Sequence, residues 1–369
     1  MRSKTKTTNS NPAATDTTRF DVGALRRKAL ALLTEVVQSE PVEHLRRRAM
    51  EKLPVRHDLP LPAALQAERK TITSSRGQTI SFYVDRGTHG RPLVLLHSIN
   101  ACASAYEVKP LFDHYRGKRP VYAAELGGFG FSERDERPYD YELYAQELID
   151  FLTRVKSQEE AADVVALSLT GEFAARVATR RPDLIHTLTL ISPTGFDGAK
   201  NGHAKMPLSR IDREKKPASA RWWSQLAYDA LASRRSISYF LSRSFVGAPD
   251  EGLVDYAYAT SHQPGARYAP FAFLAGDLFT PDVIDLYRVV DRPVLVLYDK
   301  DGFTHFDRLT DMVEKSPRWT AVRIPNTQGM PHFERLAETT EALEKFWTDQ
   351  DHAAAARHQH GAHGHAVQN

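Results

Sequence analysis

Six short apolar runs, separated by segments with helical periodicity, constrain the fold of this chain more than any other feature. The runs are residues 92–96, 120–124, 163–167, 187–191, 294–297 and 321–324. Short runs that are apolar throughout are typical of strands buried on both faces. Apolar side chains recur at helical spacing in the segments between them, which are 104–115, 140–157, 171–180, 305–315 and 333–348. The alternation predicts an α/β fold with a mostly parallel central sheet and helices on both faces.

Two further segments complete the predicted architecture. Residues 71–73 and 79–84 flank a turn that contains Gly77, which predicts a hairpin ahead of the parallel strands. Residues 199–290 separate the fourth parallel strand from the fifth and contain apolar helical stretches without a clear strand. We therefore predict a core of residues 67–198 and 291–349 with an inserted helical cap of residues 199–290.

The two ends of the chain differ in composition from this core. Residues 1–20 are rich in Thr, Asn and Ser, which predicts a disordered tail. Residues 21–66 predict a helical extension with basic and apolar side chains, which either touches a membrane surface peripherally or packs on the body with its charges solvated. Residues 350–369 are rich in His, Ala and Gly and predict a second disordered tail.

Composition argues against several functions. The net charge is only +3, so we expect no nucleic-acid partner. A single cysteine, Cys102, permits neither an intramolecular disulfide nor a zinc site built from cysteines, and neither a metal nor a cofactor is implied. Apolar runs are too short for a transmembrane helix, and the N-terminus lacks the apolar stretch of a secretory signal. We therefore expect a cytoplasmic protein, with its oligomeric state open.

Ser168 lies where a predicted strand meets a predicted helix. A sharp turn at such a junction lifts a serine hydroxyl above the carboxyl edge of the sheet, and it needs small residues two positions before and after the serine. Here those residues are Ala166 and Thr170, so the strict G-x-S-x-G motif is absent. Ser168 is therefore either a nucleophile or the capping residue of a helix.

Other motifs along the chain favour the nucleophile. The chain carries LLHS at 95–98, ELGGFGFS at 125–132 and MPHFERL at 330–336. In this order they resemble the LLHG, DLPGFGxS and GHxPHxE motifs of the α/β-hydrolase superfamily, over about residues 70–348. The resemblance implies an α/β-hydrolase fold with a cap and a Ser…Asp…His triad. In that triad Ser168 attacks a carbonyl carbon, and the backbone N–H groups of Leu169 and Ile99 bind the oxyanion.

The acid and the base of the implied triad are less well defined. Asp301 matches the acid of the family, and Asp299 and Asp197 are the alternatives. The usual base position is occupied by Gly329, whereas His332 matches the second histidine of the GHxPHxE motif. Two interpretations remain: either His332 serves as the base, or the base is absent and the fold binds a ligand.

Candidate substrate contacts come from two regions. They are His97, Ser98 and Asn100 beside the predicted oxyanion loop, and Trp222 and Trp223 in the predicted cap. Aromatic side chains over the site favour a fairly apolar small molecule. We predict a serine hydrolase that cleaves a carboxylic ester of such a substrate through an acyl-enzyme. The alternatives are a catalytically impaired binding protein of the same fold and a carbon–carbon bond hydrolase, which uses the same triad.

Overall fold

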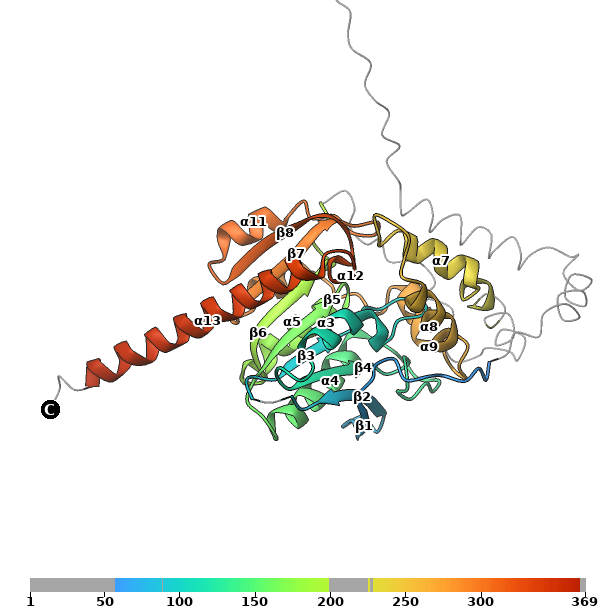
Figure 1. The fold of residues 1–369 in the computed structure, drawn as a ribbon, viewed down its shortest axis with the longest axis horizontal. Helices are drawn as coiled ribbons and strands as arrows, with labels where there is room; N and C mark the ends of the chain where they lie inside the picture. Colours follow the sequence, from blue (N-terminus) through green and yellow to red (C-terminus); the bar gives the residue numbers. More distant parts are fainter. Residues whose placement is uncertain (1–56, 88, 199–224, 226–227, 366–369) are drawn as a thin grey trace, which may run out of the picture. The chain divides into compact units, whose positions relative to one another are not determined.

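The central element is an eight-stranded sheet with the order β1-β2-β4-β3-β5-β6-β7-β8 (Figure 1). The computed structural model describes residues 57–87, 89–198, 225 and 228–365. The strands are β1 (Glu68–Thr73), β2 (Thr79–Asp85), β3 (Leu93–Leu96), β4 (Val121–Glu125), β5 (Ala162–Leu167), β6 (Ile185–Ile191), β7 (Val294–Lys300) and β8 (Trp319–Gln328). Strand β2 is antiparallel to β1 and β4, and all other neighbours are parallel. The predicted hairpin and parallel sheet are therefore confirmed.

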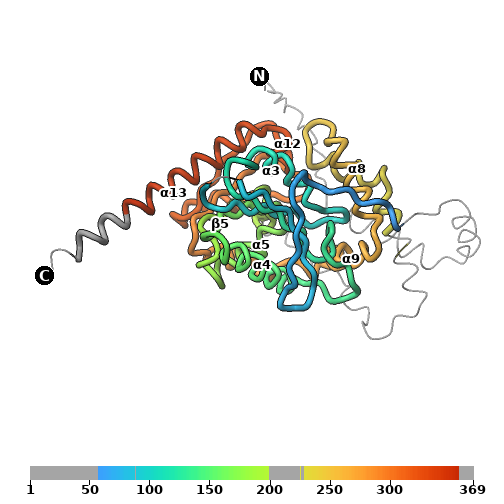
Figure 2. Tube along the Cα trace, turned by 60° about the horizontal axis from the view of Figure 1, so that its bottom comes forward, coloured from blue at the N-terminus to red at the C-terminus, as the bar shows by residue number. Residues whose placement is uncertain are grey.

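Helices connect the parallel strands and lie on both faces of the sheet. Those before β7 are η1 (Ala105–Val108), α3 (Lys109–Tyr115), α4 (Tyr141–Lys156), α5 (Thr170–Arg180), η2 (Pro182–Leu184), α7 (Arg234–Ser242), α8 (Glu251–Ser261), α9 (Tyr268–Ala275) and α10 (Val283–Arg288). Those after β7 are α11 (Leu309–Lys315), α12 (Pro331–Glu334) and α13 (Leu336–His365). Helices α4 and α5 lie on one side of the sheet, and α3 and α13 on the other (Figure 2).

Successive side chains of each strand enter two different hydrophobic layers. Val94 and Val164 belong to the layer formed with α4 and α5. Leu95 and Val165 belong to the layer formed with α3 and α13. Side chains of a strand alternate between faces, so a strand covered on both faces is apolar at nearly every position. This explains why the runs in the sequence are continuous rather than alternating.

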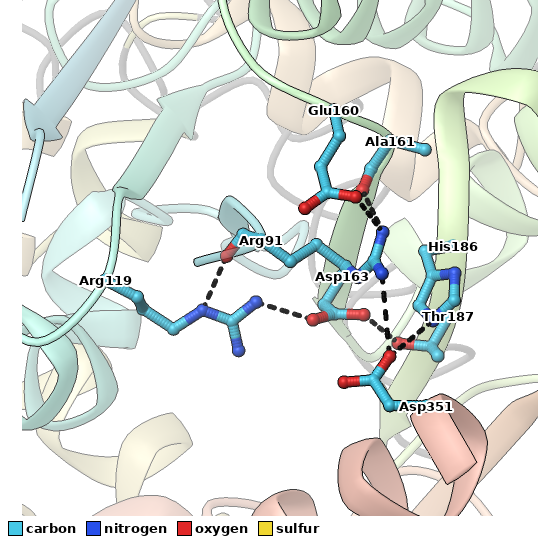
Figure 3. A network of polar contacts seen from close by, with 8 residues as sticks. All are labelled: Arg91, Arg119, Glu160, Ala161, Asp163, His186, Thr187 and Asp351. Atoms are coloured by element: carbon cyan, nitrogen blue, oxygen red, sulfur yellow. Dashed lines mark hydrogen bonds and ion pairs between the residues drawn. The ribbon is translucent and has the colours of Figure 1, made fainter. Parts of the chain in front are cut away.

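A polar network joins α13 to the amino ends of the parallel strands (Figure 3). Arg119, before β4, pairs with Asp163 of β5 at 2.5 Å. Asp351 of α13 lies 3.5 Å from Arg91 and 3.3 Å from His186 of β6. The carboxyl ends of the strands, where the family places its chemistry, are at the opposite edge. We therefore assign this network to anchoring α13 rather than to function.

The described residues bear on two predictions about the chain ends. Helix α13 extends to His365, although residues 350–369 were predicted to be disordered. The alanines at 353–356 favour helix and continue it. Residues 57–66, at the end of the predicted extension, form neither helix nor strand, and Pro60 and Pro62 disfavour helix there. The predicted helices of the extension fall within residues 21–56, outside the described residues, so they stay predictions. Residues 1–56, including the predicted tail 1–20, lie outside the described residues.

The described part of the segment between β6 and β7 contains the helices α7 to α10. Residues 199–224 and 226–227, which include Trp222 and Trp223, lie outside the described residues, so the proposed contacts of these two side chains stay predictions. Within the described ranges, none of the helices has the length and apolar composition that crossing a membrane requires.

Candidate active site

Ser168 occupies a sharp turn between β5 and α5. Its φ of 51° is uncommon for a residue other than glycine and is typical of a strained turn at a functional site. The turn is anchored to β6, because Ser168 N donates to Ile191 O at 2.9 Å. Ser168 is partly exposed, whereas every other residue from 162 to 175 is buried. The backbone therefore presents this one side chain at the carboxyl edge of the sheet.

Thr170 takes the position where the family motif has glycine. The β-branched side chain is tolerated because its Oγ1 donates to His97 O at 2.6 Å, and the residue is fully buried. Ala166, at the other position of the motif, is also fully buried. The departure from the motif thus adds a hydrogen bond between the turn and the loop after β3.

His97 has a structural role in that loop. Its Nδ1–H donates to Ser98 O at 2.6 Å, and Leu126 N donates to its Nε2 at 3.0 Å. The ring is fully buried, and burial lowers its pKa to about 4, so it is neutral. The backbone uses both ring nitrogens, so they are not available to hydrogen-bond a substrate, and a contact of His97 with a substrate stays a prediction.

The rest of the loop is organised by the buried carboxylate of Glu107. Ser98 N donates to Glu107 Oε2 at 2.7 Å, and Asn100 Nδ2 donates to Glu107 Oε1 at 2.7 Å. Asn100 also donates to Ser98 Oγ at 2.9 Å and accepts from Cys102 N at 2.8 Å. The side chains of Ser98 and Asn100 therefore act as turn residues, and their contact with a ligand stays a prediction.

Two backbone N–H groups near Ser168 have no acceptor among the described residues. They belong to Ile99 and Leu169, the predicted oxyanion donors. Leu169 precedes α5, and the first N–H groups of a helix lack partners within the helix. Donors without an internal acceptor are what an oxyanion hole requires, and the assignment of these two groups to one stays a prediction.

Asp301 lies just after β7 and is the carboxylate that fits the acid position best. Its Oδ1 accepts from Phe303 N at 2.6 Å and from Thr304 N at 3.1 Å. Burial raises its pKa to about 6, and the nearby carboxylate of Asp197 also raises it, against the two backbone donors. Its Oδ2 has no hydrogen-bond partner among the described residues and is available to orient a base.

The two alternative acids are used elsewhere. Both oxygens of Asp299 have partners, Arg323 Nε at 2.6 Å and Thr327 N at 3.3 Å. Burial acts to raise the pKa of Asp299, but the Arg323 guanidinium and the Thr327 N–H hold it below its ordinary value. Asp197 Oδ1 accepts from His305 N at 2.9 Å. Asp301 therefore remains our prediction for the acid.

Gly329 lies directly beside that acid. A Cβ at this position would be 2.9 Å from Asp301 Oδ2, so a side chain at residue 329 would start next to the carboxylate. This is the relation that a triad requires between base and acid. The chain has no side chain there, and the φ of Gly329 is +80°, which disfavours any other residue.

A segment that follows α7, residues 243–246, covers the same place, and we call it the covering segment. A Cβ at Gly329 would lie 3.4 Å from Ser244 Cα. Three hydrogen bonds hold the segment: Arg243 Nη2 to Gly302 O at 3.0 Å, Gln328 Nε2 to Arg243 O at 2.7 Å, and Val246 N to Glu334 Oε1 at 2.7 Å. Ser244 thus lies in van der Waals contact with the position that the first atom of a side chain at residue 329 would occupy.

His332 does not make the contacts that a triad base requires. Its Nε2–H donates to Glu107 O at 2.7 Å, and its Nδ1 is buried without a hydrogen-bond partner. The residue is fully buried, and burial lowers its pKa to about 4. We predicted bonds from His332 to Ser168 and Asp301, and this geometry is wrong. The cause is α12, which begins at Pro331 and directs His332 toward η1.

Sequence reasoning missed Glu107 and the covering segment. A signal for Glu107 was present, since a carboxylate among the apolar residues of 105–112 must be buried and hydrogen-bonded. The covering segment had no such signal. Its place over Gly329 depends on contacts between residues far apart in the chain.

Comparison with known proteins agrees with the fold. The model of the alpha/beta hydrolase family matches residues 93–342, and the chain belongs to this family. Among curated proteins, the chain is similar to the 1-acylglycerol-3-phosphate O-acyltransferase ABHD5 of rat and mouse, with 29% identity over 107 residues. That match covers 28% of this chain and 30% of the relative, so the chain spans less than a third of the relative's length.

Solved structures show the same fold at low sequence identity. A membrane phospholipase A superposes with a TM-score of 0.60 at 18% identity and covers 89% of this chain and 98% of that chain. A serine hydrolase involved in carbazole degradation superposes with a TM-score of 0.59 at 16% identity and covers 76% of this chain and 98% of that chain. These similarities concern the fold alone.

Proposed function

We propose that this chain binds a carboxylic ester of a small, fairly apolar molecule at Ser168 and lacks the proton transfer that makes its hydrolysis fast. The glycine at residue 329, directly beside Asp301, carries this proposal, because it leaves no imidazole at the usual base position next to the acid. The partly exposed Ser168 and the two N–H groups without an acceptor among the described residues support carbonyl binding. Relatives named as a phospholipase and an O-acyltransferase support an ester as the ligand class.

The expected loss of rate follows from the chemistry of serine. Its hydroxyl is a weak nucleophile near neutral pH and needs an adjacent base to take its proton. Removing one member of a serine triad lowers kcat by roughly 10⁴–10⁶-fold, although the oxyanion hole and binding still accelerate the reaction about 10³-fold or more over water. Ligand binding should therefore survive in this chain while turnover is slow.

Ester hydrolysis with His332 as the base is the second candidate. The observation that favours it is the buried Nδ1 of His332, which has no partner and, in the neutral ring, carries the lone pair. It requires a rearrangement that brings this nitrogen to Ser168 and a carboxylate to the other ring nitrogen. Carbon–carbon bond hydrolysis uses the same triad and is subject to the same deficit.

Turnover of p-nitrophenyl butyrate distinguishes the candidates. We expect the rates of the native chain and Ser168→Ala to agree within about tenfold, while broadening of the ester's NMR signals shows that both bind it. Ser192→Ala is the matched control, because Ser192 follows the neighbouring strand β6 and also has a positive φ, of 45°. A rate that falls about 10³-fold or more in Ser168→Ala alone would show that a working base exists.

A further inference from the structure

We infer that Glu107 is a positioning residue that sets the direction of the Ile99 N–H, the group that receives the carbonyl oxygen of the ligand. The inference rests on the proposed function only in assigning this N–H to a ligand. It concerns a buried glutamate in η1 that lies outside the motifs at 95–98, 125–132 and 330–336.

The carboxylate of Glu107 fixes the loop on one side of Ile99. Ser98 N donates to Oε2 at 2.7 Å, so the peptide that precedes Ser98 is directed inward. Glu107 is 2% exposed, and burial raises the pKa of its carboxyl group. A buried acceptor with this short contact holds a backbone N–H more firmly than water can.

The other side of Ile99 is fixed through Asn100. Its Nδ2 donates to Glu107 Oε1 at 2.7 Å, and its Oδ1 accepts from Cys102 N at 2.8 Å. One carboxylate thus determines both the start and the end of the turn. Between these two fixed points the Ile99 N–H has no acceptor among the described residues, which leaves it available for a ligand.

The backbone of Glu107 is fixed as well. His332 Nε2–H donates to Glu107 O at 2.7 Å, and both residues are buried. His332 therefore connects α12 to the glutamate that organises the oxyanion loop. This gives the histidine that resembles a family motif a positioning role in place of proton transfer.

Amide hydrogen exchange by NMR tests the inference directly. In Glu107→Ala we expect the Ser98 and Cys102 amides to exchange at least tenfold faster. In Glu107→Gln, the side-chain oxygen still accepts from Ser98 N. The new side-chain NH₂ group faces Asn100 Nδ2, and because both are donors, the hydrogen bond to Asn100 is lost. We therefore expect Ser98 to stay within about threefold of the native rate while Cys102 exchanges faster.

Glu147→Gln is the matched control, because Glu147 is another buried glutamate that accepts from a loop N–H, Gly127 N at 3.0 Å. It should leave both amides unchanged. If the Ser98 and Cys102 amides of Glu107→Gln and Glu107→Ala exchange at the rates of the native chain, the inference is overturned. If Glu107→Ala does not fold, the different responses of the two amides in Glu107→Gln still decide.

Reaction of Ser168 with a fluorophosphonate gives a functional readout. Since losing one oxyanion donor costs about 10²–10³-fold in rate, we expect Glu107→Ala to react at least tenfold more slowly, Glu107→Gln to recover most of the rate, and Glu147→Gln to match the native chain. Equal rates in all four proteins would overturn the inference. The exchange experiment needs no reaction at Ser168, so failure of the proposed function cannot be confused with failure of this inference.

Discussion

The two halves of the candidate site differ in how they are built. The nucleophile half consists of residues 97–102, Glu107 and residues 166–171. Side-chain hydrogen bonds hold its backbone in place. Two of its backbone N–H groups have no acceptor among the described residues. The acid–base half consists of residues 299–302, residues 328–334 and the covering segment, and it has an acid next to a glycine. The geometry of the nucleophile half is set by a local strand–turn–helix unit. The base depends on a single loop residue, so a glycine at that one position is enough to remove it.

Replacement of His332 gives the largest expected effect on stability. His332→Ala removes a buried hydrogen bond and leaves a cavity, so we expect the free energy of unfolding to fall by about 2–4 kcal/mol. Because His332 supports the nucleophile half without transferring protons, p-nitrophenyl butyrate turnover should change less than tenfold. Urea denaturation and steady-state rates measure the two quantities. A stable variant with a rate reduced about 10³-fold would return His332 to the role of base.

The close packing of the acid–base half predicts an intermediate effect. Gly329→Ala should lower the free energy of unfolding by about 1–3 kcal/mol, because its φ is +80° and the new Cβ would lie 2.9 Å from Asp301 Oδ2. Gly77 has a φ of +78° and nothing within 4 Å of its Cβ position. Gly77→Ala therefore measures the backbone cost alone. If both variants lose the same stability, residue 329 does not lie in close contact with the Asp301 carboxylate.

Buried glutamates in and beside the nucleophile half predict a smaller effect, which depends on pH. Burial raises the pKa of Glu147 to about 8 and that of Glu172 to about 7. The folded state therefore keeps protons that the unfolded state releases above its ordinary pKa near 4–5. This stability is complete below the unfolded pKa and declines from there by at most about 1.4 kcal/mol per pH unit for each group. It is lost once pH has passed the folded pKa, which is about 7 for Glu172 and about 8 for Glu147.

Urea denaturation between pH 5.5 and 8.5 measures this decline. Glu147→Gln imitates the protonated form, so we expect a flatter profile than in the native chain. Glu142→Gln is the control, because its hydrogen bond to Arg180 holds the pKa of Glu142 below its ordinary value, outside this window. Equal slopes in the native chain and Glu147→Gln would show that Glu147 is charged in the folded state.

The same two halves show how far the sequence could predict the structure. The strands, most helices and the turn at Ser168 follow from local periodicity, and the structure confirms these elements. The glycine at the base position was also visible from spacing within one motif. The direction of the His332 side chain could not be predicted in this way, because the same short helix can direct a side chain toward the site or toward η1. The covering segment depends on packing across more than 80 residues of chain, which no local pattern encodes.

The pH dependence of Ser168 phosphonylation tests the central claim most directly, namely that no histidine serves as base in this site. The rate constant for reaction with a fluorophosphonate would be measured by mass spectrometry in the native chain and in His332→Ala from pH 5 to 9. We predict that both rates rise together, about tenfold per pH unit, as expected when hydroxide and not a side chain removes the proton. A native rate that is fast and level across this range, and that is lost in His332→Ala, would contradict the claim.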